Sequence, residues 1–294
     1  MKGFLIALLF MVSFSFATDE FVRGLIDKLM EKGPNAWWWD KRWWEEGYIE
    51  NLPNYKVRTE MVIVKKRDVD IPVYVYRPDD DKAYPGVLFI HGRRGLDELF
   101  QLHAKRLASK GFVVVAPDLY TGRLIPQFPI EHDPIVEEDL DAVLLYAVNR
   151  KDIKNGKLCA YGLTRGGYYG IRLLVTYKRQ EKEIVCFVAY YPHMQNPNAP
   201  EPEQVYRYAP EWENLKIPTL ILVGENEQYQ RIRPALVAVD HLKAKGVPIW
   251  IVVYPGVGRG FDFRLDRRTF ADDLASKDAL IRASLFIRKY LEGR

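Results

Sequence analysis

The sequence is poor in several features that define whole classes of protein. Only two cysteines and five histidines occur among 294 residues, which excludes a disulfide-built scaffold, and no Cys/His spacing matches a zinc site. Lys and Arg total 43 against 39 Asp and Glu, so the net charge of +4 is too small to indicate nucleic acid as the main partner. With 48% hydrophobic and 13% aromatic residues, the chain is neither disordered nor collagen-like.

The N-terminus has the pattern of an export signal. Lys2 precedes an apolar run over residues 4–14, which is too short to span a bilayer comfortably, and Ser15-Phe16-Ala17 offers small residues for cleavage. We therefore predict a signal peptide over residues 1–17, cleaved after Ala17, and a secreted or periplasmic mature protein. An uncleaved membrane anchor is the alternative. No later segment is apolar and long enough to span, so we expect no membrane span after cleavage.

The two cysteines, Cys159 and Cys186, both lie inside apolar, strand-like runs. Buried core thiols are the favoured interpretation, because free cysteine behaves as a small hydrophobe. A disulfide is the alternative, since an exported protein meets an oxidising environment.

Residues 18–54 are predicted to form an extension. Apolar residues recur at helical spacing from Asp19 until Gly33-Pro34 ends the pattern. Five of the seven tryptophans follow, at Trp37, Trp38, Trp39, Trp43 and Trp44. They either pack the extension onto the following domain, which is the favoured interpretation, or form a platform for a ligand or a partner protein.

Residues 55–294 are predicted to form one α/β domain. Residues 55–65 and 69–76 alternate apolar and polar side chains, as an antiparallel strand pair does. Apolar runs then alternate with helical patterns, which indicates a mostly parallel central sheet with helices on both faces. The connection over residues 192–218 holds six prolines and is a candidate lid. The predicted parallel strands cover residues 86–90, 112–116, 158–163, 184–191, 219–223 and 248–254, and the helices residues 96–109, 136–149, 166–178, 231–245 and 270–291.

Ligand sites of open parallel sheets form at the carboxyl ends of the strands, and four ordered motifs stand there. They are Pro117-Asp118-Leu119-Tyr120, Gly162-x-Thr164-x-Gly166-Gly167, Gly224-x-x-Glu227 and Tyr254-Pro255-Gly256-x-Gly258-x-Gly260-Phe261. In this set the chain resembles the α/β-hydrolase fold and, within it, the dienelactone hydrolase family. The resemblance covers about residues 55–294.

The resemblance implies a catalytic triad, but two of its positions are substituted. Thr164 stands where the family has a Ser or Cys nucleophile, Glu227 matches the acid, and Arg259 stands where the family has its His base. Arginine remains protonated and has no acceptor, so it cannot remove a hydroxyl proton. Losing triad function typically costs about 10⁴–10⁶ in rate. We therefore expect a poor or inactive esterase with no cofactor and no metal.

An active hydrolase remains the alternative. His193 follows the strand beside the elbow strand and is a candidate substitute base for Thr164. The backbone N–H groups of Arg93 and Arg165 would then form the oxyanion hole.

Arginines gather at the predicted strand ends. Guanidinium groups bind carboxylate or phosphate through paired hydrogen bonds, so Arg94, Arg123 and Arg259 predict an anion pocket for a small molecule. In the competing interpretation, Arg259 and Glu227 form a structural ion pair.

Overall fold

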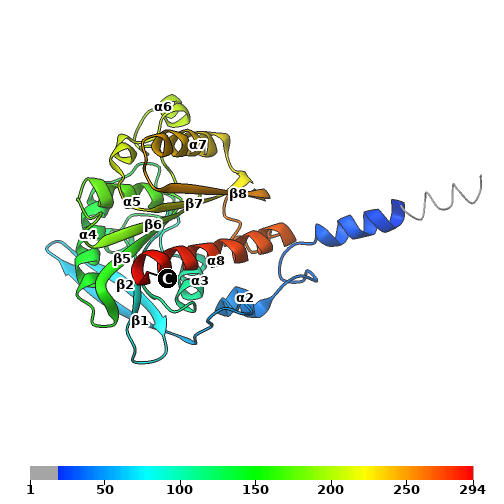
Figure 1. Cartoon of the computed structure of the whole chain (residues 1–294), viewed down its shortest axis with the longest axis horizontal. Helices are drawn as coiled ribbons and strands as arrows, with labels where there is room; N and C mark the ends of the chain where they lie inside the picture. Colours follow the sequence, from blue (N-terminus) through cyan, green and yellow to red (C-terminus); the bar gives the residue numbers. More distant parts are fainter. Residues whose placement is uncertain (1–18, 294) are drawn as a thin grey trace, which may run out of the picture.

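The computed structural model describes residues 19–293, which are built around an eight-stranded sheet (Figure 1). The strand order is β1-β2-β4-β3-β5-β6-β7-β8. β2 pairs antiparallel with β1 and β4, and all the other neighbours run parallel. The strands are β1 (Val57–Lys66), β2 (Val69–Pro78), β3 (Tyr84–Ile90), β4 (Val113–Pro117), β5 (Ile153–Leu163), β6 (Ile184–Tyr190), β7 (Thr219–Asn226) and β8 (Ile249–Gly258).

Helices cover both faces of the sheet. α3 and α8 lie on one face with the short α2, and α4, α5 and α7 cover the other (Figure 1). Two 3₁₀ turns, η1 (Thr121–Arg123) and η2 (Pro210–Asn214), lie in the connections. The helices are α2 (Lys41–Glu46), α3 (Glu98–Ala108), α4 (Ile135–Val148), α5 (Gly166–Val175), α6 (Glu201–Tyr206), α7 (Tyr229–Ala244) and α8 (Phe270–Glu292).

The predicted sheet is confirmed, including the antiparallel pair at its start. β3 is buried along its whole length, as a strand covered on both faces must be. The differences lie at element ends: α5 stops at Val175 rather than residue 178, and α7 begins at Tyr229 rather than residue 231. The predicted lid over residues 192–218 folds into α6 and η2, and α6 packs on α7.

Cys159 and Cys186 are fully buried as predicted, but the structure joins them in a disulfide, so the free-thiol interpretation was wrong. The two residues are register partners on the neighbouring strands β5 and β6, with Cα atoms 4.7 Å apart. Side chains at matched positions of adjacent strands lie on the same face of a sheet. The sequence places both residues in strands but does not reveal this register.

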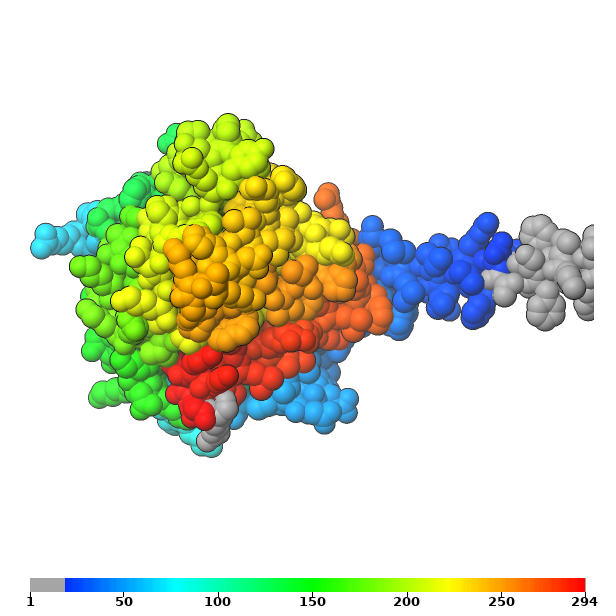
Figure 2. Space-filling model, turned by 45° about the horizontal axis from the view of Figure 1, so that its top comes forward, coloured from blue at the N-terminus to red at the C-terminus, as the bar shows by residue number. Residues whose placement is uncertain are grey.

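The extension begins with a helix over residues 19–29 that stands clear of the body (Figures 1 and 2). Beyond it, Trp38, Trp43 and Trp44 are buried, whereas Trp37 is 58% exposed. This burial supports the packing interpretation of the tryptophan cluster. The predicted signal peptide and its cleavage site lie outside the described residues. Between residues 19 and 293, no helix is both apolar enough and long enough to cross a membrane.

Candidate functional site

Thr164 lies on a sharp turn between β5 and α5. Its φ of 52° is in the left-handed region, which a β-branched residue rarely adopts. The turn depends on close backbone approach, because a Cβ at Gly166 would lie 2.2 Å from the carbonyl oxygen of Ile90. A Cβ at Gly92 would fall 1.6 Å from the Oγ1 of Thr164, so the hydroxyl lies against the loop that follows β3.

A cavity of about 460 Å³ opens beside Thr164 at the carboxyl ends of the strands. Six arginines and a single acidic residue, Asp266, line it, so its lining is strongly cationic. A hollow of about 510 Å³ between the extension and the body contains none of the predicted site residues. The cavity lining comprises Arg93, Arg94, Leu99, Phe128, Thr164, His193, Gln228, Arg231, Arg259, Phe263, Arg264, Leu265, Asp266 and Arg267.

Arg259 and Glu227 form an ion pair at this cavity. The Nε of Arg259 donates to Oε1 of Glu227 at 3.0 Å, and the side chain of Glu227 is only 1% exposed. The backbone N–H of Gln228 donates to the same oxygen at 2.7 Å. Nη2 of Arg259 and Oε2 of Glu227 are buried without a partner among the described residues. The pairing satisfies the structural interpretation, and it involves only Nε of the guanidinium group.

Arg231, in the first turn of α7, is the main site residue that sequence reasoning missed. It forms no salt bridge among the described residues and donates to Oε1 of Gln195 at 3.1 Å, while the charge of Glu227, which is already paired with Arg259, acts on it from nearby. Burial, and then the neighbouring charge of Arg259, lower the pKa of Arg231 to about 10. Its signal was proximity: Arg231 stands four residues after the recognised Glu227.

His193 lines the same cavity and is 6% exposed. Its backbone N–H donates to the carbonyl of Thr164 at 2.7 Å, which ties the end of β6 to the elbow. Burial and then the charge of Arg259 lower the pKa of His193 well below its usual value, so the imidazole is neutral at neutral pH. No hydrogen bond joins its ring to the Thr164 hydroxyl within the part of the chain described.

Arg93 and Arg165 direct their guanidinium groups to the backbone of residues 128–131. Arg93 donates to the carbonyls of Phe128 (2.8 Å) and Pro129 (2.9 Å). Arg165 donates to those of Ile130 (2.7 Å) and Glu131 (2.9 Å). These two side chains therefore hold a wall of the cavity. Their own backbone N–H groups donate to no protein acceptor between residues 19 and 293.

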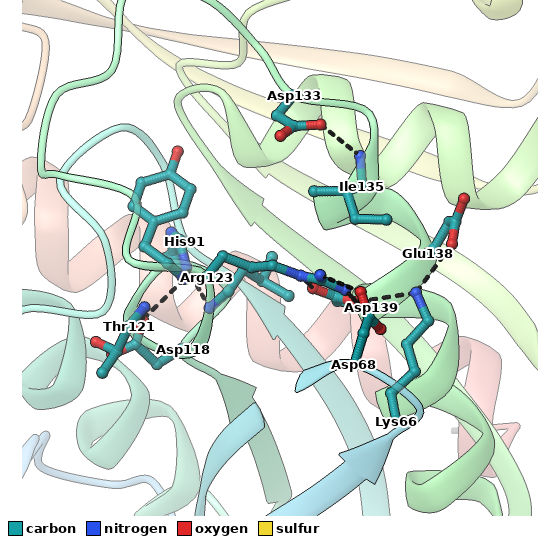
Figure 3. Close-up of polar contacts among 12 residues, drawn as sticks. Lys66, Asp68, His91, Asp118, Thr121, Arg123, Asp133, Ile135, Glu138 and Asp139 are labelled. Carbon is teal, nitrogen blue, oxygen red and sulfur yellow. Dashed lines mark hydrogen bonds and ion pairs between the residues drawn. The ribbon is translucent and has the colours of Figure 1, made fainter. Parts of the chain in front are cut away.

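The structure separates two of the predicted anion-binding arginines. Arg94 lines the cavity, where its guanidinium lies 5.6 Å from the Phe128 ring centroid and 5.3 Å from that of Phe263, and its Nε donates to Oδ2 of Asp97 at 2.6 Å. Arg123 does not line the cavity. It pairs instead with Asp68 and Asp139 (Figure 3), because η1 turns its side chain toward α4 and the β1–β2 hairpin. The expectation that Arg123 contributes to the pocket was wrong.

The other buried histidines have structural partners. Nε2 of His91 accepts from the N–H of Leu119 at 3.0 Å, so this ring packs the loop after β3. His103 contacts Asp262, and His132 contacts Glu137. Within residues 19–293, no group of three or more His, Cys, Asp or Glu side chains could hold a metal ion.

Comparisons with known proteins address the fold and the family. The family model of the dienelactone hydrolase family matches residues 71–291. This chain belongs to the dienelactone hydrolase family. Among similar proteins, the hydrolase tropI of Talaromyces stipitatus is 25% identical over 251 residues, which is 76% of this chain and 89% of that protein. The hydrolase pyvD of Aspergillus violaceofuscus is 25% identical over 239 residues, or 76% of this chain and 88% of its own length.

Solved structures show the same fold. An esterase of Pyrobaculum calidifontis superposes with a TM-score of 0.62 at 22% identity, covering 79% of this chain and 85% of that one. The α/β-hydrolase fold inferred from the sequence is therefore confirmed. The stretch matched to the dienelactone hydrolase family contains every residue of the cavity lining.

Proposed function

We propose that this dienelactone hydrolase family member binds a small anionic ligand in the arginine-lined cavity and is a poor or inactive esterase. The observation that carries the proposal is the pair Arg231 and Arg259. Arg231 is a partly buried cation without a salt bridge among the described residues, and the carboxylate that stabilises its charge, Glu227, is shared with Arg259, which stands in the position of the family's base. Two neighbouring cations that share one carboxylate leave an excess of buried positive charge, which is unfavourable, and an anionic ligand would supply the second counter-charge.

The rest of the lining favours a ligand with an apolar body. Phe128 and Phe263 flank Arg94, while Leu99 and Leu265 add aliphatic surface. Burial of apolar area contributes about 25 cal/mol per Å², so a ring system would add to the affinity of the charged group. An aromatic carboxylate meets both requirements and is the ligand class we propose.

Isothermal titration with naphthoate, acetate and the neutral naphthamide tests this proposal. Naphthoate should bind more tightly than acetate, and naphthamide should not bind. Hydrogen bonds to charged groups contribute about 1.5–3 kcal/mol, so Arg231→Met should weaken naphthoate binding by about ten- to a hundredfold. Arg233→Met is the matched control, because Arg233 lies on the same helix and outside the cavity lining. Equal binding by all three proteins would refute the site.

One set of observations favours a second function, ester or lactone hydrolysis. Thr164 and the neutral His193 line the same cavity, and the N–H groups of Arg93 and Arg165 are free. In this scheme His193 accepts the Thr164 proton during attack on an ester carbonyl, and the two N–H groups stabilise the oxyanion.

Turnover of short aryl esters separates the two functions. We expect wild-type turnover and fluorophosphonate labelling near background, with at most partial recovery in the double variant Thr164→Ser, Arg259→His. The two single variants serve as controls for either change alone. Robust wild-type turnover that is abolished by Thr164→Ala and by His193→Gln would establish the hydrolase instead.

A further inference from the structure

The tryptophan-rich extension contacts the chain segment that follows β8. The N–H of Gly33 donates to the carbonyl of Arg268 at 3.0 Å, and the rings of Trp37 and Phe270 lie 5.2 Å apart. Figure 1 shows the extension running past the start of α8 to α2, beside α3. Residues 259–267, called the site wall below, lie just before this contact and contribute six residues to the cavity lining.

Two buried arginines connect the extension to the site wall. Arg106, on α3, donates through Nη1 to the carbonyl of Trp44 and through Nη2 to the carbonyl of Asp262, both at 3.0 Å. Arg268 donates to the carbonyls of Phe261 and Asp262, both at 3.3 Å. Both guanidinium groups face the Trp44 ring, at 4.7 Å for Arg106 and 4.9 Å for Arg268.

Both guanidinium groups of this contact are buried, which costs free energy unless their donors are paired. Arg106 is 2% exposed and Arg268 is fully buried. Burial, and then the charge of Arg268, lower the pKa of Arg106 to about 10. Buried guanidinium groups are tolerated only when their donors are satisfied, and here backbone carbonyls of the extension and the site wall accept several of them. The Trp44 ring adds a cation–π contact to each.

The carboxylate of Asp262 contacts residues that lie next to the ligand cavity. Its carboxylate accepts from the hydroxyl of Tyr191 at 2.6 Å and contacts Nδ1 of His103 at 2.6 Å. The Arg259 guanidinium lies 5.5 Å from the Tyr191 ring centroid, and His193 follows two residues later. The backbone of Asp262 is thus held from the extension side, and its side chain is joined to residues that support the cavity.

We propose that the extension is a positioning element of the ligand site: Trp44, Arg106 and Arg268 hold the site wall, and through it Arg259, in the geometry that binds the ligand. This inference rests on the proposed anion-binding function only where ligand affinity is the readout. We call Trp44, Arg106 and Arg268 the clamp. Release of Trp44 from it should loosen residues 259–267 first, because both arginines donate to the carbonyl of Asp262 within that segment.

Hydrogen exchange of the full-length protein, combined with naphthoate titration, tests the clamp. Trp44→Leu removes the ring from both guanidinium groups and should accelerate exchange of the amides of residues 259–267 by about tenfold, with a similar loss of naphthoate affinity. Trp38→Leu is the matched control, since Trp38 is also buried in the extension but reaches Trp44 only through the ring of Trp39, and the rings over Arg106 and Arg268 are those of Trp43 and Trp44. If Trp38→Leu lowers the melting temperature as much as Trp44→Leu does, it should still leave the exchange rates of residues 259–267 and the naphthoate affinity within about twofold of wild type. Trp44→Phe keeps a ring and should restore slow exchange.

The outcomes separate the clamp from the function. Faster exchange confined to the site wall in Trp44→Leu supports the clamp even if naphthoate binds to no variant, in which case the proposed function fails alone. Equal exchange in the Trp44→Leu and Trp38→Leu proteins, or no change in the former, overturns the clamp. If Trp44→Leu does not fold, Arg106→Lys replaces it, because an ammonium group cannot bridge the two carbonyls as a guanidinium does. The same selective exchange is expected there, and its absence would overturn the proposal.

Discussion

Replacing Arg259 with methionine tests how strongly the protein depends on the charge that pairs with Glu227 at the cavity. The variant leaves the Glu227 carboxylate, which is 1% exposed, with the backbone N–H of Gln228 as its remaining donor. Breaking a buried ion pair by removing one partner typically costs about 3–5 kcal/mol, because an uncompensated charge remains. Arg259 itself is 16% exposed, so we expect the lower end, about 3 kcal/mol of unfolding free energy.

The double variant Glu227→Gln, Arg259→Met supplies the control. A neutral amide carries no buried charge, so the loss should fall to about 1–2 kcal/mol, which is typical of an unsatisfied polar group. Urea unfolding followed by circular dichroism, with an unchanged m-value, measures both variants. A loss below about 1 kcal/mol in Arg259→Met, or no recovery in the double variant, would show that the pair is not buried and coupled as described.

Three further predictions concern other features of the chain. The pKa of His193 is lowered mainly by burial, so the unfolded chain binds a proton that the folded chain does not. The unfolding free energy should therefore fall as the pH drops below about 6.5. In urea titrations at several pH values, His193→Gln should make the unfolding free energy depend less on pH. The Cys159–Cys186 disulfide spans 27 residues, so dithiothreitol should lower unfolding free energy by about 3–4 kcal/mol, and no effect of reductant would argue against the bond. Gly166→Ala places a Cβ 2.2 Å from a backbone oxygen and should cost at least about 3 kcal/mol in thermal unfolding, whereas Gly24→Ala, with no heavy atom within 4 Å, should cost nothing.

The positions of Thr164 and Arg259 illustrate what local sequence patterns can predict. Glycine spacing identified the elbow, because only glycine permits the close backbone approach found at Gly166. Strand order placed Glu227 and Arg259 at one edge of the sheet, and the structure pairs them. Periodicity supplied the order of strands and helices, and the resemblance to the family then assigned the elbow, acid and base positions on that backbone path.

The direction of individual side chains could not be predicted from these patterns. Arg123 and Arg94 both follow strand ends and both pair with carboxylates, yet Arg123 pairs with Asp68 and Asp139 away from the cavity, while Arg94 pairs with Asp97 and lines the cavity. Arg231 belongs to α7, which passes beside the site. Its proposed role in binding an anion depends on its charge lying near that of Arg259, which the folded chain brings about. Local patterns do not reveal these choices, because they depend on partners contributed by distant segments.

The amino-acid sequence by itself determined an α/β fold of the hydrolase type and a glycine-flanked turn bearing Thr164, and its resemblance to the family led us to expect Arg259 at the base position. Only the tertiary structure decided which arginines share the cavity, that Cys159 and Cys186 are bonded, and that Trp44 lies against the chain leading to Arg259. The physical reason is the distance along the chain over which the deciding interactions act. Helix and strand formation follow from neighbours along the chain, whereas the partner of a buried charge, ring or thiol is selected by packing among segments that are far apart in sequence.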